Sequence, residues 1–204
     1  MATGLNFRPK LDVSLLPNIV FGRRSVMSWG MFGMMIIEGT AFAIVLVVYF
    51  YLRTRSSDWP PGTIPPSLTY GTINTVIFIL SVLPNIWVSK IAKEGNLCKA
   101  KFGLWIMTLI PIANFVVRVY EFGALNCRWD GNAYGSIVWT ILGLHTFHLI
   151  TDWYDTAILL VMLYTGPIEG KTYMDVSENA EYWYFVVAAW LPIYVVLYFA
   201  PRWI

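Results

Sequence analysis

The chain consists of five long apolar runs separated by shorter polar segments. Each run reaches the roughly 20 residues that an α-helix needs to cross a bilayer. A transmembrane β-barrel would alternate apolar and polar residues, whereas these runs are apolar throughout. The pattern predicts an all-α, polytopic membrane protein with five transmembrane helices. The predicted spans lie at about 27–52, 69–90, 102–122, 134–164 and 181–200.

Composition supports a membrane protein rather than a soluble one. Of the 204 residues, 57% are hydrophobic and only 13% are charged, whereas soluble domains carry roughly 25% charged residues. We expect residues 1–26 to form an uncleaved surface tail and residues 27–204 to form one five-helix transmembrane domain. The net charge of +2 comes with no basic patch interleaved with aromatics, so no nucleic-acid partner is expected.

The distribution of Lys and Arg predicts the orientation. Four in the tail, four in the loop at 90–101 and Lys171 give nine on one side of the membrane, against five on the other. By the positive-inside rule the N-terminus is expected in the cytoplasm and the C-terminus on the periplasmic or extracellular side. Cys98 and Cys127 then lie on opposite sides, and their spacing favours free thiols.

Tryptophans and prolines in and around the spans have expected structural roles. Tryptophan favours the headgroup layer, so those near span ends are expected to anchor the helices there. They are Trp29, Trp59, Trp105, Trp129, Trp183 and Trp203. Pro84, Pro111 and Pro192 lie inside spans and predict helix kinks rather than chemistry.

Glu38 is the polar residue that the bilayer tolerates least. It lies eleven residues into the first span, roughly 16 Å from its inner end and close to the membrane midplane. A carboxylate at this depth is costly unless it is protonated, paired or hydrated, which makes Glu38 a candidate functional residue. The alternative is a neutral Glu that hydrogen-bonds to a neighbouring helix as packing.

A second group of polar residues lies on the fourth span. His145, His148, Asp152 and Asp155 are separated by three, four and three residues, which places them within an arc of roughly 80° on one helix face. That face is expected to point away from lipid. The two histidines have the same depth as Glu38, so we expect one buried polar site in which Glu38 contacts one of them.

The histidines are poor candidates for cofactor ligands. Two imidazoles one turn apart on one helix cannot occupy both axial positions of a haem, and the chain has only two His in all. We therefore expect no cofactor and no metal in this chain. Arg118 and Glu121 lie at i and i+3 near the outer end of the third span, where an interfacial ion pair is expected.

Five segments, in this order, resemble motifs of the haem-copper oxidase subunit III family. WGMFGMMIIEGTAF is similar to a family pattern that contains Glu38, and DWPPGTIPPSLTYGTINTVIFILS is similar to its next run. RVYEF stands where the family has Q-x-x-E-Y, and AYGSIVWTILGLHTFHLI resembles the segment with the two histidines. YWYFVVAAWLPIYVVLYF resembles the last one. Nearly the whole chain is covered, and it resembles the short, five-helix bacterial form.

Four positions depart from the family pattern. Arg118 stands where the family has Gln, and Thr146 where it has Gly. Tyr184 stands where it has His, and Val187 where it has Asp. The last two lie on the final helix, so a polar role of that helix in relatives is in doubt here.

The resemblance implies a subunit without redox centres in the enzyme cytochrome c oxidase, located in the bacterial inner membrane. It implies catalytic subunit I and subunit II as partners, with subunit IV or a supercomplex as further ones, and haem and copper in those partners. It also implies phospholipid in a cleft between the first two helices and the rest, and support of proton uptake and turnover stability. Glu38 matches the carboxyl group that a hydrophobic carbodiimide modifies in relatives.

Three alternatives remain open at this point. The chain could be subunit III of a quinol oxidase, because nothing in the sequence identifies the electron donor. It could be an accessory subunit of nitric oxide reductase, which shares this ancestry. It could also be a stand-alone membrane enzyme or channel that uses Glu38, His145 and His148.

Overall fold

The computed structural model describes residues 19–21, 24–94, 96–165 and 171–203. Five helices in it are long and apolar enough to cross a membrane, so the predicted fold class is confirmed and the chain is a multi-pass membrane protein. The helices are α1 (Val26–Thr54), α2 (Leu68–Glu94), α3 (Leu97–Gly123), α4 (Ala133–Thr165) and α5 (Lys171–Tyr194). A π-helical turn, Val195–Phe199, joins α5 to a final short helix, α6 (Ala200–Trp203).

A short antiparallel hairpin precedes the first span. It pairs β1 (Ile19–Phe21) with β2 (Arg24–Ser25), the only strands among the described residues. Most of the predicted tail lies outside the described residues. The fifth helix begins at Lys171, ten residues before the predicted span. Residues 171–180 are polar, so they were not recognised as part of the span, but they form a helical extension of it beyond the apolar layer. The three prolines lie inside continuous helices, and the kinks remain predictions.

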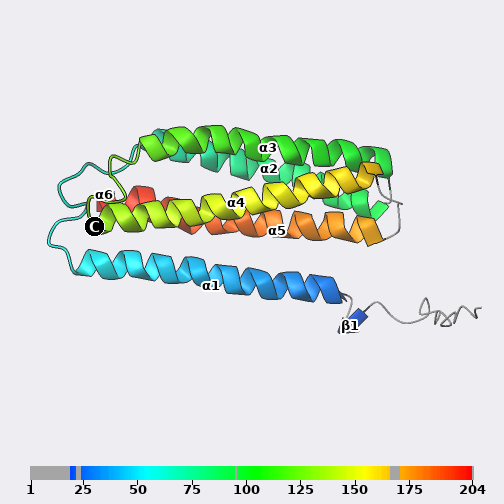
Figure 1. Cartoon of the computed structure of the whole chain (residues 1–204), viewed down its shortest axis with the longest axis horizontal. Coiled ribbons are helices and arrows are strands. Elements are labelled where there is room, and N and C mark those ends of the chain that lie inside the picture. Colours follow the sequence, from blue (N-terminus) through cyan, green and yellow to red (C-terminus); the bar gives the residue numbers. More distant parts are fainter. Residues whose placement is uncertain (1–18, 22–23, 95, 166–170, 204) are drawn as a thin grey trace, which may run out of the picture.

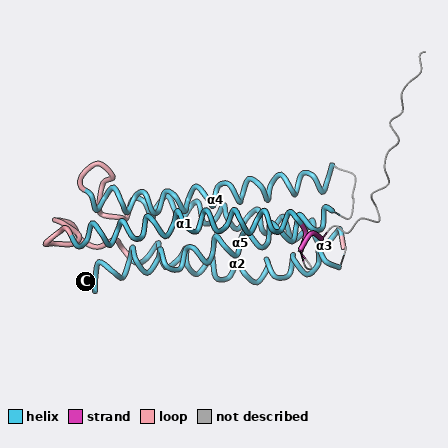
Figure 2. The backbone as a smooth tube through the Cα atoms, turned by 90° about the horizontal axis from the view of Figure 1, so that it is seen from below, coloured by secondary structure: helices cyan, strands magenta, loops and turns pink. Residues whose placement is uncertain are grey.

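The spans run alternately up and down along one axis (Figure 1). The hairpin, the α2–α3 junction and the start of α5 lie at one end, called here the hairpin end, whereas α6 lies at the opposite end. Loops 55–67 and 124–132 share that opposite end, as Figure 2 shows. Cys98 and Cys127 therefore lie at opposite ends of α3, as the sequence predicted.

Helix α1 stands to one side of the other four spans (Figure 1). Only 6% of its most apolar stretch is buried inside the protein, against 39 to 50% for the other spans. Helix α2, by contrast, is bound to α5 by several hydrogen bonds, one of them between the hydroxyl groups of Thr72 and Tyr194 at 2.7 Å. Asn85 donates to the Ala180 carbonyl at 2.8 Å, and Trp183 and Trp190 donate to Ser81 and Thr75 at 2.8 Å each; these residues form the α2–α5 contact. The family resemblance implied a cleft that separates α1 and α2 from the other helices. Because α2 is bonded to α5, that division of the helices is wrong.

The role of the tryptophans differs from one residue to the next. Trp29 and Trp203 are exposed near the ends of α1 and α6, Trp105 is exposed within α3, and Trp129 is exposed in the loop before α4. For these four residues, anchoring in the headgroup layer stays a prediction. The anchoring prediction is wrong for Trp183, which is 1% exposed, and for Trp59, which is 8% exposed. Both rings are buried in the protein, and both indole N–H groups donate hydrogen bonds inside it. Trp183 donates to the Ser81 hydroxyl group and Trp59 to the Tyr49 hydroxyl group.

Candidate functional site

Glu38 lies on α1 at a three-helix contact. Its Oε2 accepts a hydrogen bond of 2.9 Å from the hydroxyl group of Tyr182 on α5. Its Oε1 lies 3.9 Å from Nε2 of His148 on α4. The Glu38 side chain is 22% exposed and that of His148 is 9% exposed. The predicted contact between Glu38 and one of the histidines is therefore confirmed for His148.

The other ring nitrogen of His148 determines what this pair can do. Nδ1 lies 2.7 Å from the Leu144 carbonyl, so Nδ1 carries a proton and donates it. Nε2 faces Oε1 of Glu38 at 3.9 Å, which is beyond hydrogen-bond distance. The pair lies in an apolar setting, with the Phe42 ring 4.8 Å from the imidazole.

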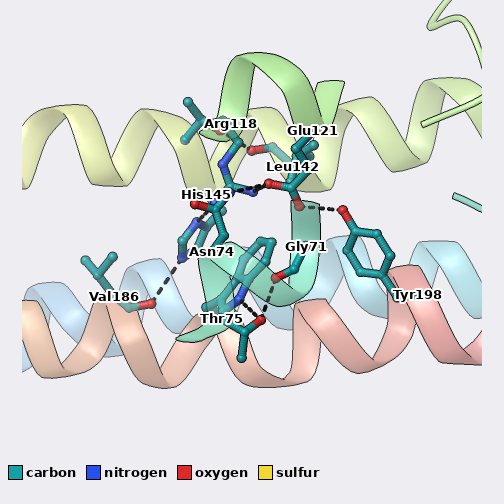
Figure 3. A network of polar contacts seen from close by, with 11 residues as sticks. Gly71, Asn74, Thr75, Arg118, Glu121, Leu142, His145, Val186 and Tyr198 are labelled. Carbon is teal, nitrogen blue, oxygen red and sulfur yellow. Dashed lines mark hydrogen bonds and ion pairs between the residues drawn. The ribbon is translucent and has the colours of Figure 1, made fainter. Parts of the chain in front are cut away.

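His145 belongs to a different network, shown in Figure 3. Its Nδ1 lies 3.2 Å from Nη2 of Arg118, and its Nε2 lies 3.1 Å from the Val186 carbonyl. Since a guanidinium group can only donate, Nδ1 accepts and Nε2 carries the proton. His145 is therefore a neutral imidazole held between α3 and α5.

Arg118 and Glu121 form the centre of this network (Figure 3). Nη1 of Arg118 donates to Oε2 of Glu121 at 2.9 Å, and the guanidinium group stacks 4.3 Å above the Trp190 ring. Asn74 on α2 donates to the same Oε2 at 2.6 Å, and the Tyr198 hydroxyl donates to Oε1. The ion pair is confirmed, and both side chains are at most 2% exposed, so the pair is buried inside the protein. Its position at the membrane interface stays a prediction.

The expectation of one polar site on α4 is corrected to two. His148 faces Glu38 on α1, whereas His145 faces Arg118 on α3. Asp152 is buried, as expected of the polar face, and its Oδ1 has no partner among the described residues. Asp155 is exposed, contrary to that expectation, because it lies at the edge of the arc, where α4 faces a cavity.

Sequence reasoning gave no role to the residues that complete the two sites. They are Asn74, Tyr182, Val186, Trp190 and Tyr198. Asn74 carried a signal, because an amide inside an apolar span needs a partner. The tyrosines and Trp190 carried none, since aromatic residues are common in such spans. Among the four departures from the family pattern, Arg118 is the one that these networks use.

A cavity of about 350 Å³ lies between α1, α4 and α5, toward the hairpin end. Its apolar wall contains Met31, Met34, Ile158, Leu159 and Met162. Its polar wall contains Asp155, Asp175, Glu178, Asn179 and Tyr182. Since Tyr182 also donates to Glu38, one side chain connects the cavity to the Glu38–His148 pair.

Comparison with known proteins gives relatives that are named cytochrome c oxidase subunit 3. The chain is 26% identical to cytochrome c oxidase subunit 3 of Spodoptera frugiperda over 142 residues, 69% of this chain and 97% of that protein. It is 24% identical to cytochrome c oxidase subunit 3 of Thermostichus vulcanus over 179 residues, 85% of this chain and 87% of that protein. The chain is a distant homologue of cytochrome c oxidase subunit 3.

Further relatives extend this likeness. The chain is also 24% identical to heme-copper oxidase subunit I+III of Aeropyrum pernix over 171 residues. This matched region is 79% of the chain and 21% of that protein. In several other cytochrome c oxidase subunit 3 relatives the matched region spans only 52 to 55% of the length. No family model matches the chain. Together, these comparisons support the subunit III family.

Proposed function

We propose that the chain is the non-catalytic subunit III of a haem-copper terminal oxidase, the complex that reduces O2 to water and translocates protons. The observation that carries this proposal is the match to cytochrome c oxidase subunit 3 over 97% of the Spodoptera frugiperda protein. Cytochrome c oxidase is the specific complex proposed, because the relatives carry that name.

The partners follow from the same relatives. One of them carries subunits I and III in a single chain, as its name states. A protein that links two subunits covalently supports the proposal that this chain lies against a separate catalytic subunit I. Subunit II completes the proposed complex, with subunit IV or a larger respiratory assembly as further partners.

The chemistry of the chain supports a non-catalytic role. Both histidines are already engaged in contacts within the chain. Among the described residues, no three His, Cys, Asp or Glu side chains lie close enough together to hold a metal ion. We therefore place the haem and copper in partner subunits. The Glu38–His148 pair would serve proton exchange rather than redox chemistry.

The cavity between α1, α4 and α5 is the proposed phospholipid site. Its methionine and aliphatic wall suits an acyl chain, because a flexible thioether side chain adapts to irregular apolar shapes. Helix α1 stands to one side of the bundle (Figure 1), and the cavity lies between it, α4 and α5. A lipid here would contact Tyr182 and thereby the Glu38–His148 pair.

The proposed location is the bacterial inner membrane, with the hairpin end in the cytoplasm. The count of nine basic residues on that side against five on the other supports this orientation.

The test compares the oxidase purified with and without this chain. We expect similar haem spectra and similar initial rates of O2 reduction, followed by faster loss of activity during turnover in the complex that lacks the chain. Identical activity throughout extended turnover would contradict the supporting role. A partner that reduces nitric oxide instead of O2 would favour the alternative complex, and a haem spectrum from the purified chain alone would contradict the non-catalytic role.

A further inference from the structure

Among the buried side-chain atoms that have no hydrogen-bond partner in the described residues, four lie on α2 and α3. They are both amide atoms of Asn114, Nε of Arg118 and Oδ1 of Asn74. Asn114 and Asn74 are fully buried, and Arg118 is 2% exposed. Buried polar groups in folded proteins are nearly always hydrogen-bonded to protein or water, and lipid offers neither donor nor acceptor. These atoms therefore point to a polar ligand inside the bundle.

The unpartnered atoms belong to neighbouring side chains. Asn114 and Arg118 are four residues apart on α3, so they lie one above the other on the same helix face. Arg118 and Asn74 both donate to the same carboxylate oxygen, Oε2 of Glu121, at 2.9 and 2.6 Å. Figure 3 shows Asn74 and Arg118 converging on Glu121 between α2 and α3. Arg118 is therefore a neighbour of Asn114 on its own helix and of Asn74 across the Glu121 carboxylate.

The chemistry of the four atoms selects the ligand. Asn114 Nδ2 and Arg118 Nε are donors, whereas Asn114 Oδ1 and Asn74 Oδ1 are acceptors. A cation would be repelled by Arg118, and an anion by Glu121. An apolar molecule would leave all four atoms unsatisfied. A water molecule accepts two hydrogen bonds and donates two, which matches this set.

We propose that the bundle holds an internal water site next to Asn114 and Arg118, with a contact to Asn74. This water gives Arg118 its third hydrogen bond, since Nη1 and Nη2 are already used by Glu121 and His145. A guanidinium group that donates from all three of its nitrogens is fixed in orientation. The water is therefore a structural ligand that positions Arg118 between α3 and α4. All the side chains of this water site belong to this chain.

The test is a structure of the protein purified from its native membrane, with its accompanying subunits, at a resolution that shows ordered water. We expect a solvent peak within hydrogen-bond distance of the Asn114 amide and Arg118 Nε. An Asn114 amide bonded directly to a protein carbonyl or side chain, with no peak beside it, would overturn the proposal.

Two variants make the test specific. Asn114→Leu removes the donor and the acceptor at similar size, so the peak is expected to be lost. Thr108→Val is the matched control, because Thr108 is also buried on α3 but its hydroxyl group already donates to the Leu104 carbonyl at 2.8 Å. The peak should persist in the control. A peak unchanged in Asn114→Leu would contradict the proposal, and the unaltered protein alone decides if that variant does not assemble.

Discussion

At Glu38, a carboxyl group lies in the middle of the helix that the protein covers least. Its partners, Tyr182 and His148, come from two other helices. Because Tyr182 donates to one carboxyl oxygen, Glu38 is hydrogen-bonded whether it is protonated or ionised. Glu38 therefore attaches α1 to α4 and α5, in addition to the proton exchange proposed for the Glu38–His148 pair. Substitutions at these two positions should separate the two roles.

Glu38→Gln should leave stability nearly unchanged. The amide oxygen still accepts from Tyr182, and the amide N–H can donate to Nε2 of His148, so we expect a loss within about 1 kcal/mol. The measurement is the thermal unfolding midpoint of the purified protein. Modification by a hydrophobic carbodiimide should be lost in the same variant, as it requires the acid. Failure of the variant to assemble would instead show that the ionised carboxylate is structurally required.

His148→Ala should be more harmful, because it removes the polar neighbour of a half-buried acid and leaves a gap beside Phe42. We expect a loss of about 1 to 3 kcal/mol. Phe147→Ala is the control, since Phe147 is the adjacent residue but is 62% exposed toward lipid. Unfolding midpoints equal to those of the unaltered protein in both variants would argue against the Glu38–His148 contact.

Arg118→Met should be the most destabilising of these changes. It leaves Glu121 buried with only Asn74 and Tyr198 as donors, and breaking a buried ion pair from one side costs about 3 to 5 kcal/mol. Arg118→Gln, which introduces the residue of the family pattern, keeps a donor near Glu121 and should cost less. The double variant Arg118→Met with Glu121→Met should recover much of the loss. Additive losses in unfolding experiments would contradict the coupling.

The sequence identified the polar residues but not their grouping. Depth along a helix follows from counting residues, and it correctly placed Glu38 level with the histidines. The direction in which each histidine points relative to other helices depends on how the bundle packs. His145 and His148 differ by about 60° around α4, which is enough to send one to α3 and the other to α1. A single sequence contains no signal for that choice.

Among the elements, α2 packs closely against the end of the fifth span at Gly71. A Cβ atom built there would lie 2.5 Å from the ring of Tyr198. The ring cannot move away freely, because the Tyr198 hydroxyl group is bound to Glu121. Glycine at this position therefore allows α2 and the π-helical turn to pack.

Gly71→Val should consequently destabilise the bundle by about 1 to 3 kcal/mol through overpacking. Gly143→Ala is a matched control in the middle of α4, where an added Cβ meets nothing within 4 Å. The control should be neutral or stabilising by up to about 1 kcal/mol, because alanine favours a helix over glycine. Thermal unfolding of the two variants side by side measures the contrast, and equal midpoints would refute the close contact.

The helices themselves were largely predictable, because each span is an uninterrupted apolar run. The missed part is the start of α5, where Lys171 to Ala180 is too polar to be recognised as part of a span. The burial of Trp183 and Trp59 was also missed. Tryptophan near a span end fits either the headgroup layer or the core, and only the packing of neighbouring helices decides between them.

At the scale of the whole molecule, the two cysteines report on topology. Cys98 is exposed near the start of α3, and Cys127 lies half-buried beyond its end. A membrane-impermeant maleimide should label a variant that retains only Cys98 from the cytoplasmic side of the membrane, in inverted vesicles. Labelling of both single-cysteine variants from the same side would contradict the five-span topology.

The pH dependence of Cys127 is a separate expectation. Burial raises the pKa of the Cys127 thiol to about 11. The reactive thiolate is therefore only about one part in a thousand at pH 8, and its share rises about tenfold for each further pH unit up to that pKa. Labelling of a variant that retains only Cys127 should be slow at neutral pH and accelerate accordingly. A rate that is already maximal at pH 8 would rule out a buried thiol.

The most direct measurement of the central claim is an optical difference spectrum, reduced minus oxidised, of material purified through an affinity tag on this chain in mild detergent. Identification of the co-purifying subunits accompanies it. The proposal predicts haem bands together with a haem-copper catalytic subunit. A chain that purifies alone, without haem bands, from membranes that contain an active terminal oxidase would contradict it.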